Sequence, residues 1–271
     1  MSRPGLVHLV FTNLAGAGGS GYRHLWTADW SAEERVPVES WLQAVTEAAA
    51  ERPGYAGAPF RAAGRTWRAL ARAESGTASD EFGRHGRLGH ALLAEVAEGA
   101  GLEAGERLLA TLERAWEGGG SRGDLAGLWR RCEELDVLDP GPPAAGRASV
   151  PADDPLLAHV LAASAARGHV PHEAAVPAGG ADAAADLLRR LDLLPPRLRL
   201  SLRWSTVEPA PPETALVLRT AAGATAPRAE LPPVAGRYRE LIGRAPDELT
   251  GDWSIRSWRD VGERLEGAGV E

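Results

Sequence analysis

The segment from Pro140 to Pro151 constrains the fold of this chain more than any other. Prolines and glycines follow one another closely there, and no helical or strand periodicity runs through it. Such a segment cannot continue a helix or a strand. The residues on either side are numerous enough to build a core of their own. We therefore expect a first domain over residues 1–139, a linker over 140–152 and a smaller domain over 153–271.

Both halves mix strand and helix patterns without regular alternation between the two. Apolar and alternating patterns predict strands at 6–11, 60–63, 66–73, 198–206 and 214–220. Helical spacing with breakers at the ends predicts helices at 39–51, 88–98, 104–116, 124–135, 156–165, 182–194, 237–244 and 254–265. This order predicts an α+β fold in two subdomains.

Two side-chain patterns carry more specific predictions. In the strand 66–73, Arg68 and Arg72 share one face of an edge or surface strand. We expect this face to be solvated, and the alternative is that it forms the rim of a contact with an acidic partner. A group of aromatic residues in the first part of the chain is expected to pack in the core. These residues are Tyr22, Trp26, Trp30 and Trp41.

The charge of the chain excludes several classes of protein. A formal net charge of −7 argues against a nucleic-acid partner, because phosphate binding needs a basic face. The sequence contains no lysine, so its positive side chains are all arginine. A Walker A loop, a kinase strand lysine and a Schiff-base lysine are therefore all excluded. The excess of Ala, Gly, Pro and Arg suggests a bacterium with a high-GC genome.

The cysteine count and the apolar runs of the sequence indicate where in the cell we expect the protein. Cys132 is the only cysteine, which excludes intrachain disulfides and zinc ribbons. His169 and His172 have a plausible ligand spacing in a proline-containing loop, yet we predict neither a metal nor another cofactor. No apolar run approaches the length of a membrane helix or of a signal peptide. We expect a cytoplasmic protein without a membrane partner.

The segment from Ser79 to Leu93 is the densest in groups that could carry chemistry or recognition. Its glycines allow close approach of another backbone or a ligand. Its arginines would lie near the start of the helix expected from Leu88, where an anion is favoured. The candidate residues for binding a partner or an anion are Asp80, Gly83, Arg84, Gly86, Arg87 and His90. The alternative is a glycine-rich turn in which Asp80 caps local backbone and His90 packs in the core.

This segment also carries a family resemblance. Gly83, Arg84, Gly86, His90, Ala91 and Leu92 match a Gly-Arg-x-Gly-x-x-x-His-Ala-Leu pattern. Further along, Leu194-Pro195-Pro196 and the run Leu200 to Thr206 are similar to a Leu-Pro and Ser-Phe-Ser-Thr pattern in which Trp204 replaces Phe. In these features the chain resembles the N-terminal and part of the middle domain of bacterial GTPase-associated proteins, which belong to conflict gene clusters of the antiviral-defence type.

The resemblance implies a non-enzymatic adaptor that acts beside a small GTPase or other conflict-system proteins. It carries no catalytic residue over to this chain. In that role Arg84 and Arg87 would contact an acidic partner surface or a phosphate, and an arginine finger is a sharper variant. The alternatives are a hydrolase or phosphoryl-transfer enzyme using Asp80, Arg84 and His90, and a nucleotide or anion sensor.

Overall fold

A computed structural model provides the structure of the chain. It describes residues 6–13, 22–49, 53–79, 85–96, 105–117, 125–135, 150–151, 153–166, 171–177, 179–220, 229–244 and 247–267. Asp80, Gly83 and Arg84, three of the predicted site residues, lie outside these ranges.

A mixed sheet forms the centre of the described part of the chain. Its eight strands follow the order β2-β1-β5-β4-β3-β7-β8-β6. Neighbouring strands from β2 to β7 pair antiparallel, whereas β8 pairs parallel with both β7 and β6. The strands are β1 (Leu6–Thr12), β2 (Arg23–Trp26), β3 (Gly54–Ala62), β4 (Arg65–Ser79), β5 (His85–Val96), β6 (His172–Val176), β7 (Trp204–Ser205) and β8 (Leu216–Thr220).

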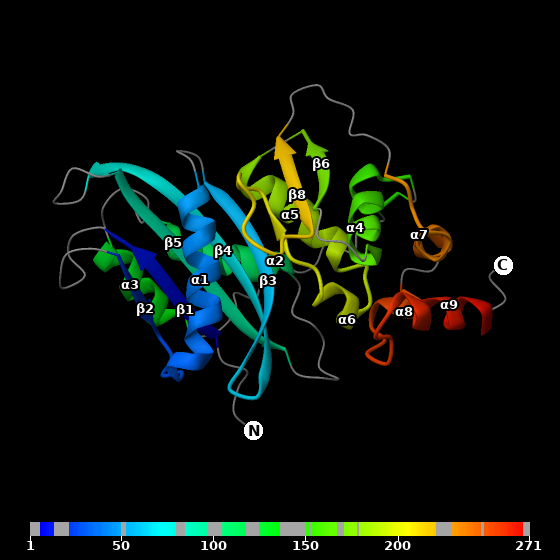
Figure 1. Ribbon diagram of the computed structural model, residues 1–271, viewed down its shortest axis with the longest axis horizontal. Helices are drawn as coiled ribbons and strands as arrows, with labels where there is room; N and C mark the ends of the chain where they lie inside the picture. The colour runs from blue at the N-terminus through cyan, green and yellow to red at the C-terminus, as the bar shows by residue number, and fades with distance from the viewer. Residues whose placement is uncertain are drawn as a thin grey trace.

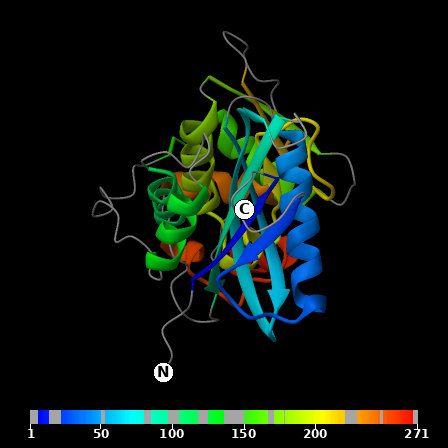
Figure 2. The same cartoon turned by 90° about the vertical axis from the view of Figure 1, so that its left-hand side faces the viewer.

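Helices cover both faces of the antiparallel part (Figures 1 and 2). Figure 2 shows α1 on one side of the sheet and the green helices α2 and α3 on the other. Helices α4 and α5 pack beside the parallel strands, and α7 to α9 lie at the far end of the molecule in Figure 1. The helices are α1 (Ala32–Ala48), α2 (Gly105–Trp116), α3 (Leu125–Glu134), α4 (Pro155–Ala165), α5 (Gly180–Leu191), α6 (Pro196–Arg199), α7 (Pro233–Arg244), α8 (Asp247–Thr250) and α9 (Trp258–Gly267).

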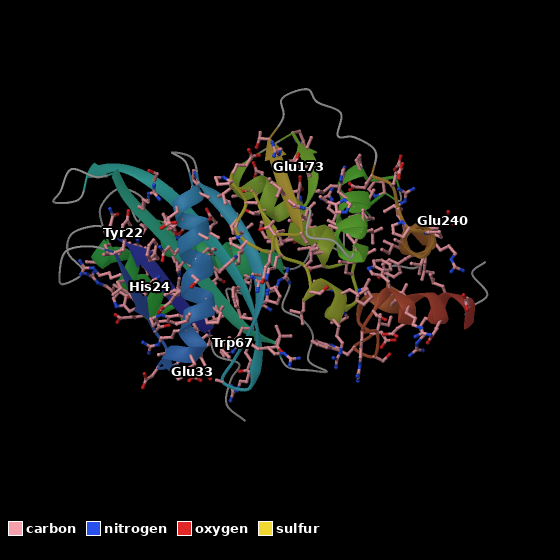
Figure 3. The ribbon with its side chains drawn as sticks, in the orientation of Figure 1. Tyr22, His24, Glu33, Trp67, Glu173 and Glu240 are labelled. Carbon is pink, nitrogen blue, oxygen red and sulfur yellow. The ribbon has the colours of Figure 1, made fainter. Side chains whose placement is uncertain are left out.

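Helix α1 begins earlier than the sequence pattern predicts. Ser31 caps it, and Glu34 returns a hydrogen bond to the Ser31 backbone in a capping box. Ser-x-x-Glu is a start signal that was readable from the sequence. Trp41 and Leu42 are buried against the sheet, which confirms the core prediction for Trp41. Trp30 is also buried, whereas Tyr22 is 46% exposed and stacks with Phe11 beside His24 at the β2 edge (Figure 3).

Strand β5 replaces the helix that spacing predicts at 88–98, so that prediction was wrong. The strand lies between β1 and β4, and helices cover both of its faces. Leu88, Ala91 and Leu92 have the spacing of a helical stripe, but a strand buried on both faces needs apolar residues at nearly every position. Short apolar runs of this kind do not distinguish the two structures.

The strand predicted at 198–206 is also largely wrong. Pro196 begins the short helix α6, for which its fixed φ is suited, and strand pairing is limited to Trp204 and Ser205. Strand β4 is not an edge or surface strand, since β5 and β3 flank it. Arg68 and Arg72 therefore lie on a covered face rather than a solvated one.

The sheet and the core both continue across the predicted domain boundary. Strand β3 pairs with β7, and one apolar cluster joins Leu112 of α2 to Leu187 of α5. Most of the segment 140–152 lies outside the described residues. The boundary stays a prediction, while the α+β class is confirmed. Among the described helices, none combines the length and apolarity needed to cross a bilayer.

Candidate functional site

The predicted recognition segment joins the ends of two long paired strands. Ser79 of β4 pairs with His85 of β5, so residues 80–84 connect the two strands of a hairpin. The hairpin reaches the end of the sheet opposite α4 and α5 (Figure 1). Of the six candidate residues, Gly86, Arg87 and His90 are described, and all three lie on β5.

Arg87 and His90 point to opposite faces of the sheet. The Arg87 guanidinium donates to the backbone carbonyl of Glu47, 3.3 Å away in the last turn of α1. A positive side chain is favoured there by the helix dipole. His90 faces the other way and bonds to α2, as the strand alternation requires. The two side chains cannot meet on one substrate.

Gly89, which lies between Arg87 and His90 in the sequence, has a packing role. A Cβ at this position would lie 1.9 Å from Thr46 Oγ1 and 3.2 Å from Leu42 Cδ1. Helix α1 therefore rests directly on the backbone of β5. The close approach expected of this glycine is made to a helix of the same chain.

His90 is the centre of a buried hydrogen-bond chain. Trp116 Nε1–H donates to His90 Nδ1 at 3.2 Å, and the indole nitrogen can only donate. Neutral His90 consequently carries its proton on Nε2, which lies 2.9 Å from His8 Nδ1. His8 in turn donates from Nε2 to the carbonyl of Leu135, also at 2.9 Å. The partners thus assign one tautomer to each ring.

The protonation states of His90 and His8 agree with this chain of hydrogen bonds. Burial lowers the pKa of His90 well below its ordinary value, and the neighbouring His8 and Arg72 lower it further. Burial also lowers the pKa of His8, and the hydrogen bond to the Leu135 carbonyl raises it in part. Both rings are therefore neutral at neutral pH. A fully buried neutral His90 has no exposed surface with which to contact a partner or an anion.

Cys132 joins the same cluster although the sequence places no histidine near it. Its Sγ lies 3.5 Å from His90 Nε2. Burial raises the pKa of the thiol to about 12. The thiolate is the nucleophilic form, so this cysteine is inert at neutral pH.

His8, His90 and Cys132 also have the composition of a metal site, since their ligand atoms lie within 4.8 Å of one another. A metal on His90 Nε2 would require the ring proton on Nδ1. That proton would face the N–H of Trp116, and two donors repel each other. The cluster therefore fits a hydrogen-bond chain better than a metal centre.

Charged residues surround the hydrogen-bond chain of His90 on the face of the sheet that α2 covers. The Arg72 guanidinium lies 4.3 Å from the ring centroid of Trp116 and bonds to Glu113 at 2.7 Å. Tyr55 donates its hydroxyl to the same carboxylate at 2.8 Å, and its pKa is raised, chiefly by burial. The guanidinium of Arg72 is thus held between an indole and a carboxylate, a structural arrangement.

A second charged group lies where the sheet meets α5 and α6. Arg199 donates to the Asp192 carboxylate at 2.9 Å, whereas Arg68 reaches the same carboxylate only at 3.6 Å. Arg68 is 9% exposed. The strand pattern predicted a solvated face for Arg68, and that prediction was wrong. No local signal identifies Asp192 or Arg199, because only the tertiary contact between the two halves brings them together.

No family model matches the sequence, and no curated protein is significantly similar to it.

Proposed function

We propose that this chain is a non-enzymatic interaction module that binds a protein partner through the tip of the β4–β5 hairpin. The observation that carries the proposal is that β5 directs Arg87 and His90 to opposite faces of the sheet. Arg87 lies at the α1 side, close to the hairpin connection, while His90 is buried on the opposite face. The hydrolase hypothesis needs His90 to reach a substrate together with Asp80 and Arg84, and the complete burial of His90 opposes it.

The position of the segment supports the same proposal. Loops held by a rigid scaffold are common recognition sites. Strands β4 and β5 provide such a scaffold, because they lie in the interior of the sheet with helices on both faces. Substitutions in residues 80–84 should change binding without changing the core.

The partner that we propose is a small GTPase, or another protein of the same conflict system, in the cytoplasm. The support for this part is the resemblance in the glycine-rich segment, together with the absence of lysine from the chain. A chain that cannot form a Walker A loop would act beside a GTPase rather than as one.

Affinity capture tests the proposal. The tagged full chain is incubated with native cytosol in the presence of GDP or a non-hydrolysable GTP analogue, and bound proteins are identified by mass spectrometry. We expect a small GTPase whose capture depends on the nucleotide and is lost with Arg84→Ala or Arg87→Ala.

Arg259→Ala is the matched control, because Arg259 lies in α9 with a largely exposed side chain. Capture should be unchanged in this variant. If no GTPase is captured with either nucleotide, the partner proposal fails. If capture survives both hairpin variants, the hairpin is not the binding surface.

A further inference from the structure

The hydrogen-bond chain of His90 has no position for another proton. Trp116 Nε1–H donates to His90 Nδ1, and His90 Nε2–H donates to His8 Nδ1. His8 Nε2–H then donates to the carbonyl of Leu135. A second proton on either ring would have to occupy Nδ1, where it would face the N–H group that already donates to that nitrogen. Two donors repel each other, so an added proton breaks one bond of the chain.

The charges around the two rings do not offset an added proton. His90 and Arg72 are paired positions on neighbouring strands. Burial is the largest cause of the lowered pKa of His90, and the charges of His8 and Arg72 lower it further. The carboxylates of Glu74 and Glu113 form ion pairs with Arg72. Within the described residues, no carboxylate bonds to His8 or His90.

Helix α3 adds no compensating charge at the rings. It contributes the thiol of Cys132, whose Sγ lies 3.5 Å from His90 Nε2. Burial raises the pKa of this thiol to about 12, while the charges of the adjacent Arg131 and Glu133 act on it in opposite directions. The thiol is therefore neutral at neutral and at mildly acidic pH.

The last bond of the chain holds the end of α3. Leu135 directly follows the helix, and its N–H donates to the Arg131 carbonyl at 2.9 Å, which continues the helical pattern. The Leu135 carbonyl accepts the bond from His8 of β1. In Figure 2, α3 lies on the side of the sheet opposite α1. The histidine chain thus ties the C-terminal end of α3 to the sheet.

Apolar packing and one arginine provide the other attachments of α3 in the part of the chain that the structure describes. Arg131 Nε–H donates to the Ala115 carbonyl at 2.7 Å. The buried residues of the helix share a small apolar cluster with β1, β5 and α2, and they are Leu125, Leu128 and Cys132. A helix of 10 residues is not stable by itself in water. The helical state of α3 therefore depends on its docking.

We propose that the His8–His90 pair is a pH-sensitive latch for α3, which releases the helix from the sheet when either ring takes up a proton while the rest of the chain stays folded. The added proton breaks the chain either between Trp116 and His90 or between His90 and His8. Detachment of α3 relieves the contact between donors, because it lets the rings turn and reach water.

The direction of the pH effect follows from linkage. In the docked state the pKa of each ring is lowered, whereas rings that reach water titrate near the ordinary value of 6.5. The detached state therefore binds more protons below that pH. The ratio of docked to detached α3 should fall by up to about tenfold per pH unit for each ring that gains a proton. Above that range the ratio should not depend on these histidines.

Release of α3 would uncover part of the sheet near the hairpin connection. Leu88 of β5 packs in the cluster under α3 and directly follows Arg87. The latch could thereby change the surface beside the proposed binding site. It does not depend on the identity of the partner, so failure of the GTPase proposal would leave the latch intact, and the reverse also holds.

Hydrogen exchange of the full chain, read by mass spectrometry, tests the proposal. Labelling at about pH 7.5 and about pH 5.5 is compared after correction for the intrinsic exchange rate. We expect the amides of α3 to be protected at the higher pH and to lose protection by at least about tenfold at the lower pH. The amides of α1 report unfolding of the core, and their protection should remain well above that of α3.

The decisive variant carries both His8→Gln and His90→Gln. Glutamine offers one acceptor and an N–H donor but does not titrate, so the protection of α3 should no longer depend on pH. His24→Gln is the matched control, because His24 lies against Phe11 and Glu39 on the α1 side, and it should keep the wild-type response. If the double variant does not fold, His8→Phe replaces it. This variant lacks the bond to Leu135, so α3 should be poorly protected at both pH values.

Three results would overturn the proposal. One is protection of α3 in the wild-type chain that is absent or equal at both pH values. Another is simultaneous loss of protection in α3 and α1 to the same level, which would indicate unfolding of the whole chain. The third is a response of α3 to pH that persists in the double variant, or wild-type protection of α3 in His8→Phe.

Discussion

The two faces of the antiparallel sheet differ in character, and β4 contributes to both. Toward α1 it presents Trp67, Ala69, Ala71 and Ala73, which pack in an apolar cluster (Figure 3 labels Trp67). Toward α2 and α5 the same strand presents Arg68, Leu70, Arg72 and Glu74. One face of the strand is thus apolar, whereas the other combines apolar packing with hydrogen bonds and charge.

The difference shows where this chain concentrates its chemistry. On the α1 face, alanines and Gly89 leave room for α1 to lie close to the sheet. The α2 face buries His8, His90 and Arg68 and partly covers Arg72, and the burial of such groups is tolerated where partners satisfy them. Arg68 forms an ion pair with Asp192 at 3.6 Å. The following predictions test this contrast, from the largest expected effect to the smallest.

Leu42→Ala should break the apolar face. Leu42 is fully buried between α1 and β5, so its truncation leaves a cavity. We expect the free energy of unfolding to fall by about 3 kcal/mol, measured by urea denaturation. Val36→Ala on the same helix is the control, because Val36 is 56% exposed and its loss should cost much less. Equal losses would contradict the assigned face of α1.

Gly89→Ala should separate α1 from β5. The added methyl group would meet Thr46 Oγ1, and we expect a loss of about 2 kcal/mol in the free energy of unfolding. Thr46→Ala removes that oxygen, so the double variant should lose less than the sum of the two single variants. Strict additivity in this cycle would show that the contact is absent.

The buried histidines on the α2 face should make the free energy of unfolding depend on pH. His8 and His90 have lowered pKa values in the folded chain, whereas the unfolded chain binds their protons below about pH 6.5. The unfolded state then binds more protons, so the free energy of unfolding falls as the pH decreases below that value. The slope is at most about 1.4 kcal/mol per pH unit for each histidine.

Urea denaturation from about pH 7.5 to about pH 5 measures this slope. His90→Gln should be less stable than wild type at the upper end and should show a flatter dependence. An unchanged slope in His90→Gln would argue against a neutral buried His90.

Ala63→Gly should be the smallest change and should stabilise the chain. Ala63 has φ of 53° in the two-residue turn between β3 and β4, a left-handed conformation that costs energy for alanine. Glycine adopts it freely, so we expect a gain of up to about 1 kcal/mol in the free energy of unfolding. Gly64→Ala, at φ of 70° in the same turn, should lose stability instead.

Parts of the fold were predictable wherever a local signal is strong. Asp154 before Pro155 marks the start of α4, and its carboxylate accepts from the Leu157 amide as a cap. The first strand and the helix ending at Trp116 follow equally from local patterns. Strand β5 was not predictable in this way, because its apolar spacing suits a buried helix as well as a strand.

The candidate site was less predictable than the fold. Arg87 and His90 are three residues apart, which on the expected helix would place them close together. On a strand the same separation sends them to opposite faces. Asp192, which pairs with both Arg68 and Arg199, lies more than a hundred positions from Arg68 in the sequence, and no spacing reveals such a contact.

The sequence by itself determined the α+β class, the helix caps and the kinds of side chain available for chemistry, because these depend on neighbours along the chain. Tertiary structure alone decided which face each side chain occupies, that Arg68 is buried, and that Cys132 lies against His90. The physical reason is that strand pairing and helix packing join residues distant in sequence. Burial and charge balance are properties of those joined surfaces.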